Sequence, residues 1–236
     1  MIDFHTHILP GIDDGSRDIQ MSSELLLLQK EQGIKQIALT PHFYAQSENV
    51  QRFLKKRDKA YESLRETANS LELDISFKLG AEVYYFPGIG RADMLPDLRL
   101  QYTDYLLLEM PFAQWSKGIY LDVKDIIERQ NINVILAHVE RFYPFQKDKS
   151  IWKEILELPI VFQINTGSLM TWRSRRFDTK FIKSGHKVIL GSDCHNVTNR
   201  VPNMREGQAI LERKLGSQII GEIEERGEKI WKNEKV

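Results

Sequence analysis

The histidines of this chain gather with acidic residues in four short clusters, and each cluster follows a run of apolar residues. Five of the six histidines take part. The clusters are Asp3-Phe4-His5-Thr6-His7 with Asp13-Asp14 just beyond, Pro41-His42, His138-Val139-Glu140-Arg141, and Asp193-Cys194-His195. Imidazole nitrogens and carboxylate oxygens are the groups with which proteins bind divalent transition-metal cations. The sequence therefore predicts a metal site before any other chemistry.

The elements that position these clusters alternate along the chain. Apolar runs predict strands at residues 2–5, 36–40, 75–80, 105–109, 133–138, 160–165 and 187–192. Amphipathic segments between and after them predict helices at residues 19–32, 50–71, 119–130, 151–158, 180–185, 204–215 and 218–232. Strands that read as continuous apolar runs and alternate with helices are typical of parallel sheets covered on both faces.

Seven strands are one short of a full (β/α)8 barrel, so we expect a distorted (β/α)7 TIM-like barrel over residues 1–236 as a single domain. A doubly wound open sheet is the alternative. In parallel α/β barrels the reactive groups lie at the C-terminal ends of the strands. This fold would bring into one cleft the polar residues that follow six different predicted strands, namely His5 and His7, His42, Glu82, Glu109, His138, and Asp193 with His195.

The bulk composition restricts the function. Lys+Arg and Asp+Glu are equal at 33 each, which gives no electrostatic support for nucleic-acid or membrane-surface binding. The chain has one cysteine and no run of apolar residues long enough to span a membrane. We expect a cytoplasmic protein without membrane insertion, and the oligomeric state stays open.

The candidate metal ligands are the acidic and imidazole side chains at the predicted strand ends. They are His5, His7, Asp14, His42, Glu82, Glu109, His138, Asp193 and His195. Nine ligands exceed what one ion accepts and suit two or three ions that share carboxylates. Nitrogen and oxygen donors without thiolate favour manganese, iron or zinc in an open site. His186 stands apart, before the last predicted strand, and is interpreted as structural.

Several motifs carry a resemblance to a known family. They are Asp3-Phe4-His5-Thr6-His7 with Gly11-Ile12-Asp13-Asp14-Gly15, Thr40-Pro41-His42, Gly80-Ala81-Glu82-Val83-Tyr84-Tyr85, Leu108-Glu109-Met110-Pro111, His138-Val139-Glu140-Arg141 and Ser192-Asp193-Cys194-His195-Asn196. In this order they resemble PHP (polymerase and histidinol phosphatase) domains. More narrowly, they resemble the bacterial tyrosine-protein phosphatases of capsular and exopolysaccharide loci. Val139 departs from the proline that some relatives have there.

The resemblance implies a trinuclear centre at the rim of a distorted barrel. It assigns one ion to His5, His7, Glu82 and Asp193, a second to Glu82, Glu109 and His138, and a third to Asp14, His42 and His195. It implies that Arg141 and Arg200 grip the substrate phosphate, as a guanidinium fork can. It also implies a phosphotyrosine substrate, in the tail of a tyrosine autokinase that governs polysaccharide export.

These features together predict hydrolysis of a phosphate monoester by metal-activated hydroxide, without a phosphoenzyme. One alternative keeps the metals and changes the substrate to histidinol phosphate, another small phosphoester or a nucleic-acid phosphodiester. Another is a non-catalytic module in which the ions are structural. A third is a cysteine-dependent phosphatase, because Cys194 and Arg200 have the spacing Cys-x5-Arg. The intervening residues contain no glycine, which disfavours it.

Two further groups of residues surround the predicted cleft. The loops after the ligands are aromatic, with Phe43-Tyr44, Tyr84-Tyr85-Phe86, Phe112 with Trp115, Phe142-Tyr143, and Trp172. As a group they favour an aromatic substrate, although any single ring is expected to pack under its loop. The basic run Arg173-Ser174-Arg175-Arg176 is interpreted as the solvated start of a helix rather than as a surface for an acidic peptide.

Overall fold

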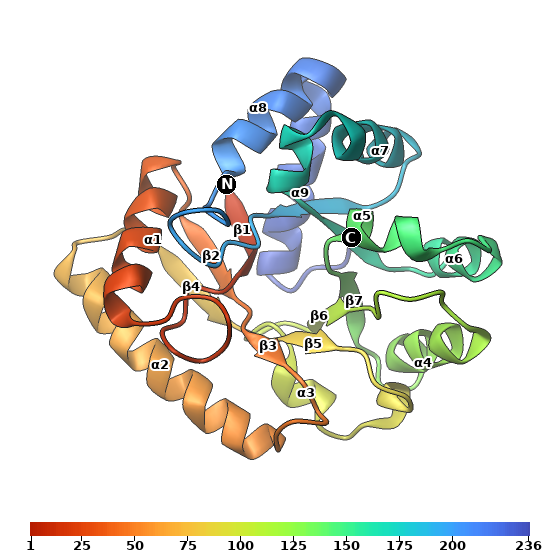
Figure 1. Cartoon of the computed structure of the whole chain (residues 1–236), viewed down its shortest axis with the longest axis horizontal. Coiled ribbons are helices and arrows are strands. Elements are labelled where there is room, and N and C mark those ends of the chain that lie inside the picture. The colour runs from red at the N-terminus through yellow and green to blue at the C-terminus, as the bar shows by residue number, and fades with distance from the viewer.

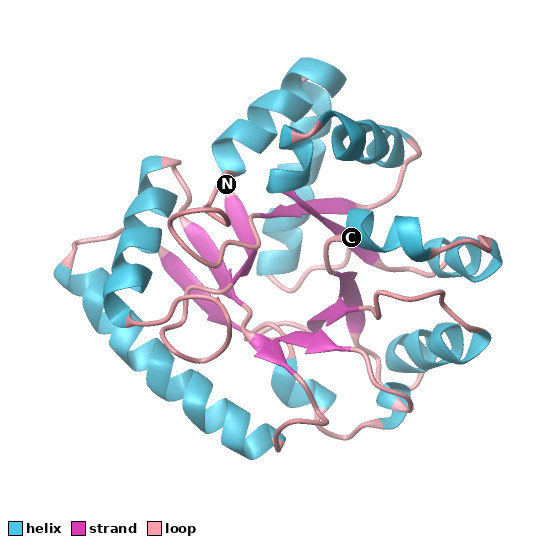
Figure 2. Cartoon of the chain, in the orientation of Figure 1, coloured by secondary structure: helices cyan, strands magenta, loops and turns pink.

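A computed structural model describes residues 1–236. Its strands are all parallel and form two hydrogen-bonded sheets surrounded by helices (Figures 1 and 2). The first sheet has the order β1 (Ile2–Thr6), β2 (Gln36–Leu39), β4 (Ser76–Leu79). The second has the order β3 (His42–Phe43), β5 (Glu82–Tyr84), β6 (Tyr105–Glu109), β7 (Asn133–Leu136), β8 (Val161–Asn165), β9 (Val188–Gly191).

The two sheets continue one another. Strand β3 follows β2 and strand β5 follows β4 after an interruption of two residues, so each pair is one interrupted strand. At the other edge, β9 lies beside β1: the amide of Asp193 donates to the carbonyl of His5 at 2.8 Å, and the amide of His7 donates to the carbonyl of Cys194 at 3.0 Å. The strands thus stand in sequential order around a ring, as Figure 2 shows.

The predicted parallel α/β fold is confirmed, in a barrel-like arrangement without a closed hydrogen-bonded sheet. A doubly wound sheet requires a reversal of strand order, and the sequential order here has none.

The helices cover the outside of this ring (Figure 2). They are α1 (Ile19–Glu31), α2 (Val50–Ser70), α3 (Leu95–Leu98), α4 (Lys117–Glu128), α5 (Val139–Phe142), α6 (Ser150–Leu156), α7 (Trp172–Lys183), α8 (Met204–Leu215) and α9 (Ser217–Trp231). Three 3-10 turns, η1 (Ile89–Arg91), η2 (Tyr143–Phe145) and η3 (Thr166–Met170), lie between them. None of these helices has the length and apolar character needed to cross a membrane.

All seven predicted strands and seven predicted helices are present, with small differences at their ends. The helix predicted at residues 180–185 begins earlier, at Trp172, because Thr171 caps it by accepting a hydrogen bond from the amide of Ser174. The short strands β3 and β5 and the short helices α3 and α5 were not predicted.

Alternate residues of the strands face two different cores. In β6, Leu106 and Leu108 belong to a cluster of 45 buried residues that includes the buried faces of the helices. Leu107 belongs to a second cluster of 11, with Phe4 of β1 and Ile189 of β9. Burial on both faces explains the continuous apolar strands. It also leaves only the strand ends free for polar chemistry.

Candidate metal centre

The nine predicted ligands come together in one cluster at the C-terminal ends of the strands. Eight of them are buried or nearly so, and only Asp14, in the loop after β1, is exposed. Their donor atoms form four overlapping groups, each with all atoms within 4.8 Å of one another. The groups are His7, Asp14, His42 and His195; His5, Glu82 and His138; His5, His7 and Asp193; and His42, Glu82 and Glu109.

Glu82, at the start of β5, is the centre of this cluster. Its Oε2 lies 3.1 Å from Nε2 of His5, 3.3 Å from Nε2 of His7 and 3.0 Å from Nδ1 of His42. Its Oε1 lies 2.8 Å from Nε2 of His138. One carboxylate therefore contacts four imidazoles from three separate parts of the sequence.

Two other carboxylates join the remaining histidines to this centre. Oδ1 of Asp14 lies 3.5 Å from Nε2 of His42 and 3.4 Å from Nε2 of His195. Oδ1 of Asp193 lies 3.6 Å from Nε2 of His5 and 3.4 Å from Nε2 of His7. The last candidate carboxylate is Glu109, whose Oε1 lies 3.5 Å from Nε2 of His138.

The donor atoms fit divalent cations. Ligand atoms that surround one cation at about 2.1 Å stand roughly 3–3.5 Å from one another, and most separations here are of this size. Nδ1 of His42, Oε2 of Glu82 and Nε2 of His195 are buried without a hydrogen-bond partner. Buried polar atoms are rarely left so unless an ion or water serves them. The donor set therefore suits cations shared between the groups.

The backbone at two of the candidate ligands is strained. His138 has φ 27° and Asp193 has φ 53°, in the left-handed region that residues with side chains seldom adopt. Such strain persists where surrounding structure fixes it, and it clusters at functional sites. Gly191 lies two residues before Asp193. A Cβ added at Gly191 would stand 2.7 Å from the Cβ of His5, so the close approach of the two strands requires glycine here.

The electrostatics of the cluster keep its central carboxylates ionised. Burial raises the pKa of Glu82, but the charge of His5, a hydrogen bond from His138 and the close contact of His42 outweigh burial and hold the pKa well below its ordinary value. Burial likewise raises the pKa of Asp193, and the charge of His5 with contacts from His7 and Arg141 brings it well below the ordinary range. Ionised carboxylates are the form that binds a cation.

The pKa values of His138 and His195 are shifted in opposite directions. Burial lowers the pKa of His138, but hydrogen bonds to Glu109 and Glu82 raise it to about 9. Burial together with the charge of His7 lowers the pKa of His195 to about 3. His195 is therefore a neutral imidazole at any physiological pH, which is the ligand form.

Three supporting residues were missed at the sequence level. Oδ2 of Asp13 lies 2.7 Å from Nδ1 of His7 and also accepts from the amide of His42 at 3.0 Å. Oε1 of Gln163 accepts from the amide of His138 at 2.8 Å and lies 3.0 Å from Nδ1 of His5. Asn165 donates to Oδ2 of Asp193 at 2.9 Å. Such partners orient metal ligands. The only signal was the pair Asp13-Asp14, of which the second alone was chosen.

The two predicted phosphate-binding arginines flank the cluster. Nη2 of Arg141 lies 2.6 Å and Nη2 of Arg200 lies 2.7 Å from Oδ2 of Asp193. Their side chains are 38% and 35% exposed, so both guanidinium groups remain accessible. They line a polar hollow of about 470 Å³ beside the cluster, together with Ser168, Ser174 and other residues of the surrounding loops.

The aromatic loops divide into two sets. Phe43, Trp115 and Phe142 are buried and pack under their loops. Tyr44 and Phe112 are each 40% exposed and stand beside candidate ligands, with ring centroids 5.3 Å from His42 and 6.1 Å from His138. The buried rings of the first set cannot meet a substrate, whereas the exposed rings of the second set can.

The remaining sequence candidates lie outside the cluster or are inert. Cys194 is fully buried, and burial together with the charge of Asp3 raises the pKa of its thiol to about 12. A thiol that stays protonated cannot be the nucleophile, which excludes the Cys-x5-Arg reading. His186 stacks on Phe181 with centroids 4.3 Å apart, as expected for a structural residue.

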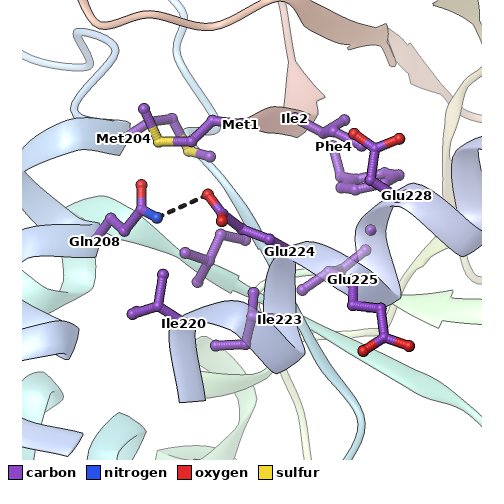
Figure 3. Close-up of a pocket in the computed structure, with 13 residues that line it drawn as sticks. Met1, Ile2, Phe4, Met204, Gln208, Ile220, Ile223, Glu224, Glu225 and Glu228 are labelled. Carbon is purple, nitrogen blue, oxygen red and sulfur yellow. Dashed lines mark hydrogen bonds between the residues drawn. The ribbon is translucent and has the colours of Figure 1, made fainter. Parts of the chain in front are cut away.

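A separate cavity lies on another side of the molecule, where α8 and α9 pack against β1 and β9 (Figure 3). Its volume is about 220 Å³, and its walls are mainly apolar, from Met1, Phe4, Met204, Ile220 and Ile223. Its rim is polar, and there Gln208 donates to Oε1 of Glu224 at 2.9 Å. We call it the seam cavity. It contains none of the predicted ligands.

The comparisons with known proteins agree with this geometry. The family described as capsular polysaccharide synthesis, CpsB/CapC, matches residues 1–229. Tyrosine-protein phosphatase YwqE of Bacillus subtilis (strain 168) is 26% identical over 251 residues, covering 100% of this chain and 93% of the relative. Tyrosine-protein phosphatase CpsB of Streptococcus pneumoniae is 25% identical over 238 residues, covering 94% of each.

Solved structures show the same fold. One belongs to a set described as crystal structures of YwqE from Bacillus subtilis and CpsB from Streptococcus pneumoniae, unique metal-dependent tyrosine phosphatases. It superimposes with a TM-score of 0.88 at 24% identity and covers 100% of this chain and 96% of that one. A proposed histidinol phosphatase, hisK of Listeria monocytogenes, gives a TM-score of 0.54 at 17% identity over 83% of this chain and 95% of that one.

Proposed function

This chain belongs to the CpsB/CapC family of capsular polysaccharide synthesis, and from that premise we propose that it is a metal-dependent protein-tyrosine phosphatase. The curated relatives named above are tyrosine-protein phosphatases. The substrate we propose is phosphotyrosine in the tail of a tyrosine autokinase that controls capsular or exopolysaccharide synthesis. Because phosphotyrosine is made from ATP, we propose the cytoplasm as its location. Residues 1–236 would act as a single domain.

The observation that carries this proposal is the convergence of nitrogen and oxygen donors around Glu82. Its carboxylate contacts four histidines from β1, β3 and the end of β7, with separations between 2.8 and 3.3 Å. A structural zinc site needs four ligands and closes around one ion. A cluster of nine donors that is open on the side of Asp14 suits catalysis instead.

We propose that the donors hold three ions. His5, His7, Glu82 and Asp193 would hold the first, Glu82, Glu109 and His138 the second, and Asp14, His42 and His195 the third. His7 also lies within reach of the third group. Manganese is the metal we favour, with iron or zinc as alternatives, because the ligands are imidazole and carboxylate without thiolate. When bound, such ions neutralise the charge of a phosphate dianion and lower the pKa of water to about 7.

Arg141 and Arg200 would hold the non-bridging phosphate oxygens. Both guanidinium groups are anchored on the same oxygen of Asp193, which fixes them at the border between the ligand cluster and the polar hollow. Each retains further N–H groups for a second acceptor. The planar fork of arginine matches two oxygens of a phosphate at once.

The surroundings of the cluster favour an aryl phosphate over an alkyl phosphate. The exposed ring of Tyr44 lies beside His42, and the exposed ring of Phe112 lies beside His138. Both could stack on a phenyl group. A tyrosine phenolate, with an ordinary pKa of about 10, is also a better leaving group than an alkoxide. It therefore needs less help from a proton donor.

The test is elemental analysis of the purified protein, paired with chelation and stepwise addition of manganese during a phosphotyrosine-peptide assay. We expect bound metal, loss of turnover on chelation and recovery on addition. Histidinol phosphate, the substrate of the alternative reading, is assayed in parallel and should be hydrolysed more slowly. A preparation that is fully active without bound metal would refute the proposal.

A matched pair of variants separates the cluster from general effects of histidine loss. His138→Gln removes a residue that contacts Glu82 and Glu109, whereas His186→Gln changes a histidine that stacks on Phe181. Only the first should lower metal content and turnover. Equal losses in both would show that the effect is one of folding.

A further inference from the structure

Helix α7 presents a row of exposed cations with no acidic partner. Arg173, Arg176, Lys180 and Lys183 are all exposed, and their spacing places them on one face of the helix. None of them forms an ion pair. The only acid on α7 is Asp178, which is fully buried. We call these four residues the α7 basic face.

Two other helices pair an exposed cation with an acid on the same helix. Lys229 pairs with Glu225 and Lys124 pairs with Glu128, in each case one turn apart on the same helix. The basic run at the start of α7 is itself divided. Arg175 donates to the carbonyls of Leu169 and Met170 and so has a structural role. Because Asp178 is buried, the exposed cations of α7 have no acid on their own helix with which to pair.

The α7 basic face begins beside the polar hollow. Ser174, in the first turn of α7, lines that hollow together with Arg141 and Arg200. Trp172, the first residue of α7, is 71% exposed, and the guanidinium of Arg176 lies 6.0 Å from its ring centroid. The N-terminal end of a helix also favours negative charge. A chain that leaves the hollow along α7 would thus meet an exposed indole and then a row of cations.

We propose that the α7 basic face and Trp172 bind the acidic residues that flank a phosphotyrosine, so that the enzyme prefers acidic phosphotyrosine segments. This proposal rests on the proposed function. The occupant is an acidic peptide because the face is cationic and continuous with the hollow that holds the two arginines. Balanced overall charge, 33 basic against 33 acidic residues, gives no support for a nucleic acid in the same place.

The test is the double variant Arg173→Glu/Arg176→Glu. Both residues are exposed, and an acidic residue at position 173, in the first turn of the helix, is favourable, so the variant should fold. The matched control is Arg213→Glu/Lys214→Glu, the same charge change at the exposed C-terminal end of α8. That end lies about 15 Å along the helix from the residues beside the hollow.

Three substrates are compared: p-nitrophenyl phosphate, an acidic phosphotyrosine peptide, and the same peptide with Asp and Glu replaced by Asn and Gln. The α7 variant should raise KM for the acidic peptide about 10-fold, the sum of a few exposed charge pairs, and leave kcat unchanged. It should not change turnover of the other two substrates. The effect should shrink in high salt, because exposed charges are screened.

Binding of the unphosphorylated acidic peptide, followed by calorimetry, tests the surface without turnover. We expect the wild type and the α8 control to bind it and the α7 variant to bind it about 10-fold more weakly. Equal binding by all three proteins would overturn the proposal, as would an oligonucleotide that displaces the peptide at lower concentration. If the wild type binds the peptide through this face but hydrolyses no aryl phosphate, the proposed function fails and the binding surface stands.

Discussion

The metal centre and the seam cavity are both hollows in this chain, but they are built from opposite materials. The metal centre brings together carboxylates and imidazoles whose buried atoms include several without hydrogen-bond partners. The seam cavity is walled by Met1, Phe4, Ile220 and Ile223, and at its rim Gln208 and Glu224 bond to each other (Figure 3). Unsatisfied polar groups that point to one place, rather than empty volume, mark where chemistry can occur.

The difference extends to the backbone. Strain at His138 and Asp193 is held by bonds from neighbouring strands, such as the one from the amide of Asp193 to the carbonyl of His5. Around the seam cavity, α8 and α9 are regular helices. Substitutions in the first region should therefore change metal binding and catalysis, and substitutions in the second should change stability alone.

The sharpest test of this contrast is a pair of identical substitutions, Glu82→Gln and Glu224→Gln. Loss of a supporting partner of a metal ligand costs up to about 100-fold, so loss of the shared ligand Glu82 should lower activity by more than about 100-fold and reduce bound metal. Glu224→Gln should leave both unchanged. Bound metal and kcat/KM are measured for the two variants. If both variants lose metal and activity to the same extent, the proposed difference between the metal centre and the seam cavity is wrong.

Arg141→Ala separates phosphate binding from metal binding within the first region. We expect kcat/KM for an aryl phosphate to fall about 100-fold, as for the loss of a charged donor in an active site, while metal content stays near that of the wild type. Steady-state kinetics with elemental analysis measure both. Unchanged kinetics would retire the role of Arg141 in gripping phosphate.

Much of the first region could be predicted from the sequence because strand ends in a parallel barrel converge. The apolar runs before His5, His138 and Asp193 located those residues at the rim, and the structure brings them together. Glu82 was found only as a residue after a strand, and its central position depends on the register of β5 against β6.

Other features could not be predicted because they depend on contacts distant in sequence. The sequence shows Gln163 only as a residue inside a predicted strand, yet its Oε1 contacts both the ring of His5 and the amide of His138. The interruption that divides β2 from β3 follows from the local path at residues 40–41, which the apolar pattern does not encode. The α7 basic face became visible only when the structure showed that Arg175 turns inward and Arg173 does not.

Ile223→Ala tests the second region. Ile223 is 6% exposed and lines the seam cavity, so its truncation enlarges an existing void. We expect a loss of about 2–4 kcal/mol in the free energy of unfolding, the usual cost of a buried Ile to Ala change, with unchanged kcat per folded molecule. Urea unfolding and active-site titration measure the two. A lower kcat in fully folded Ile223→Ala protein would show that the seam cavity affects catalysis, which contradicts the proposed separation of the two regions.

Asp178→Asn tests a third kind of site, a buried acid next to the polar hollow. Burial raises the pKa of Asp178 from its ordinary value of 3.8 to about 7, and the charge of Asp178 adds to the effect of burial in raising the pKa of Glu140 to about 8. The folded chain thus keeps a proton that the unfolded chain releases near pH 4. Stability from this residue is present below about pH 4 and is lost as pH rises through about 7.

Asparagine removes that titration and can still accept the hydrogen bond from Ser168. The variant should match the wild type near pH 4 and be about 1–3 kcal/mol more stable at pH 8. Urea unfolding at the two pH values gives the difference. A stability difference that does not change with pH would show that Asp178 is not protonated in the folded chain.

The smallest expected effect comes from Gly221→Ala in α9, close to the seam cavity but facing away from it. An added Cβ at Gly221 would meet no atom within 4 Å, and the residue lies inside an exposed stretch of helix. Alanine restricts the unfolded chain and suits the helix, so we expect about 0.5–1 kcal/mol of added stability. Gly227→Ala is the matched opposite, because its Cβ would stand 3.1 Å from the ring of Phe4 at the cavity wall. Thermal unfolding measures both variants. If both are stabilised to the same extent, the wall of the seam cavity can accept an added methyl group without cost. Its packing then contributes less to stability than we infer from the contrast with the metal centre.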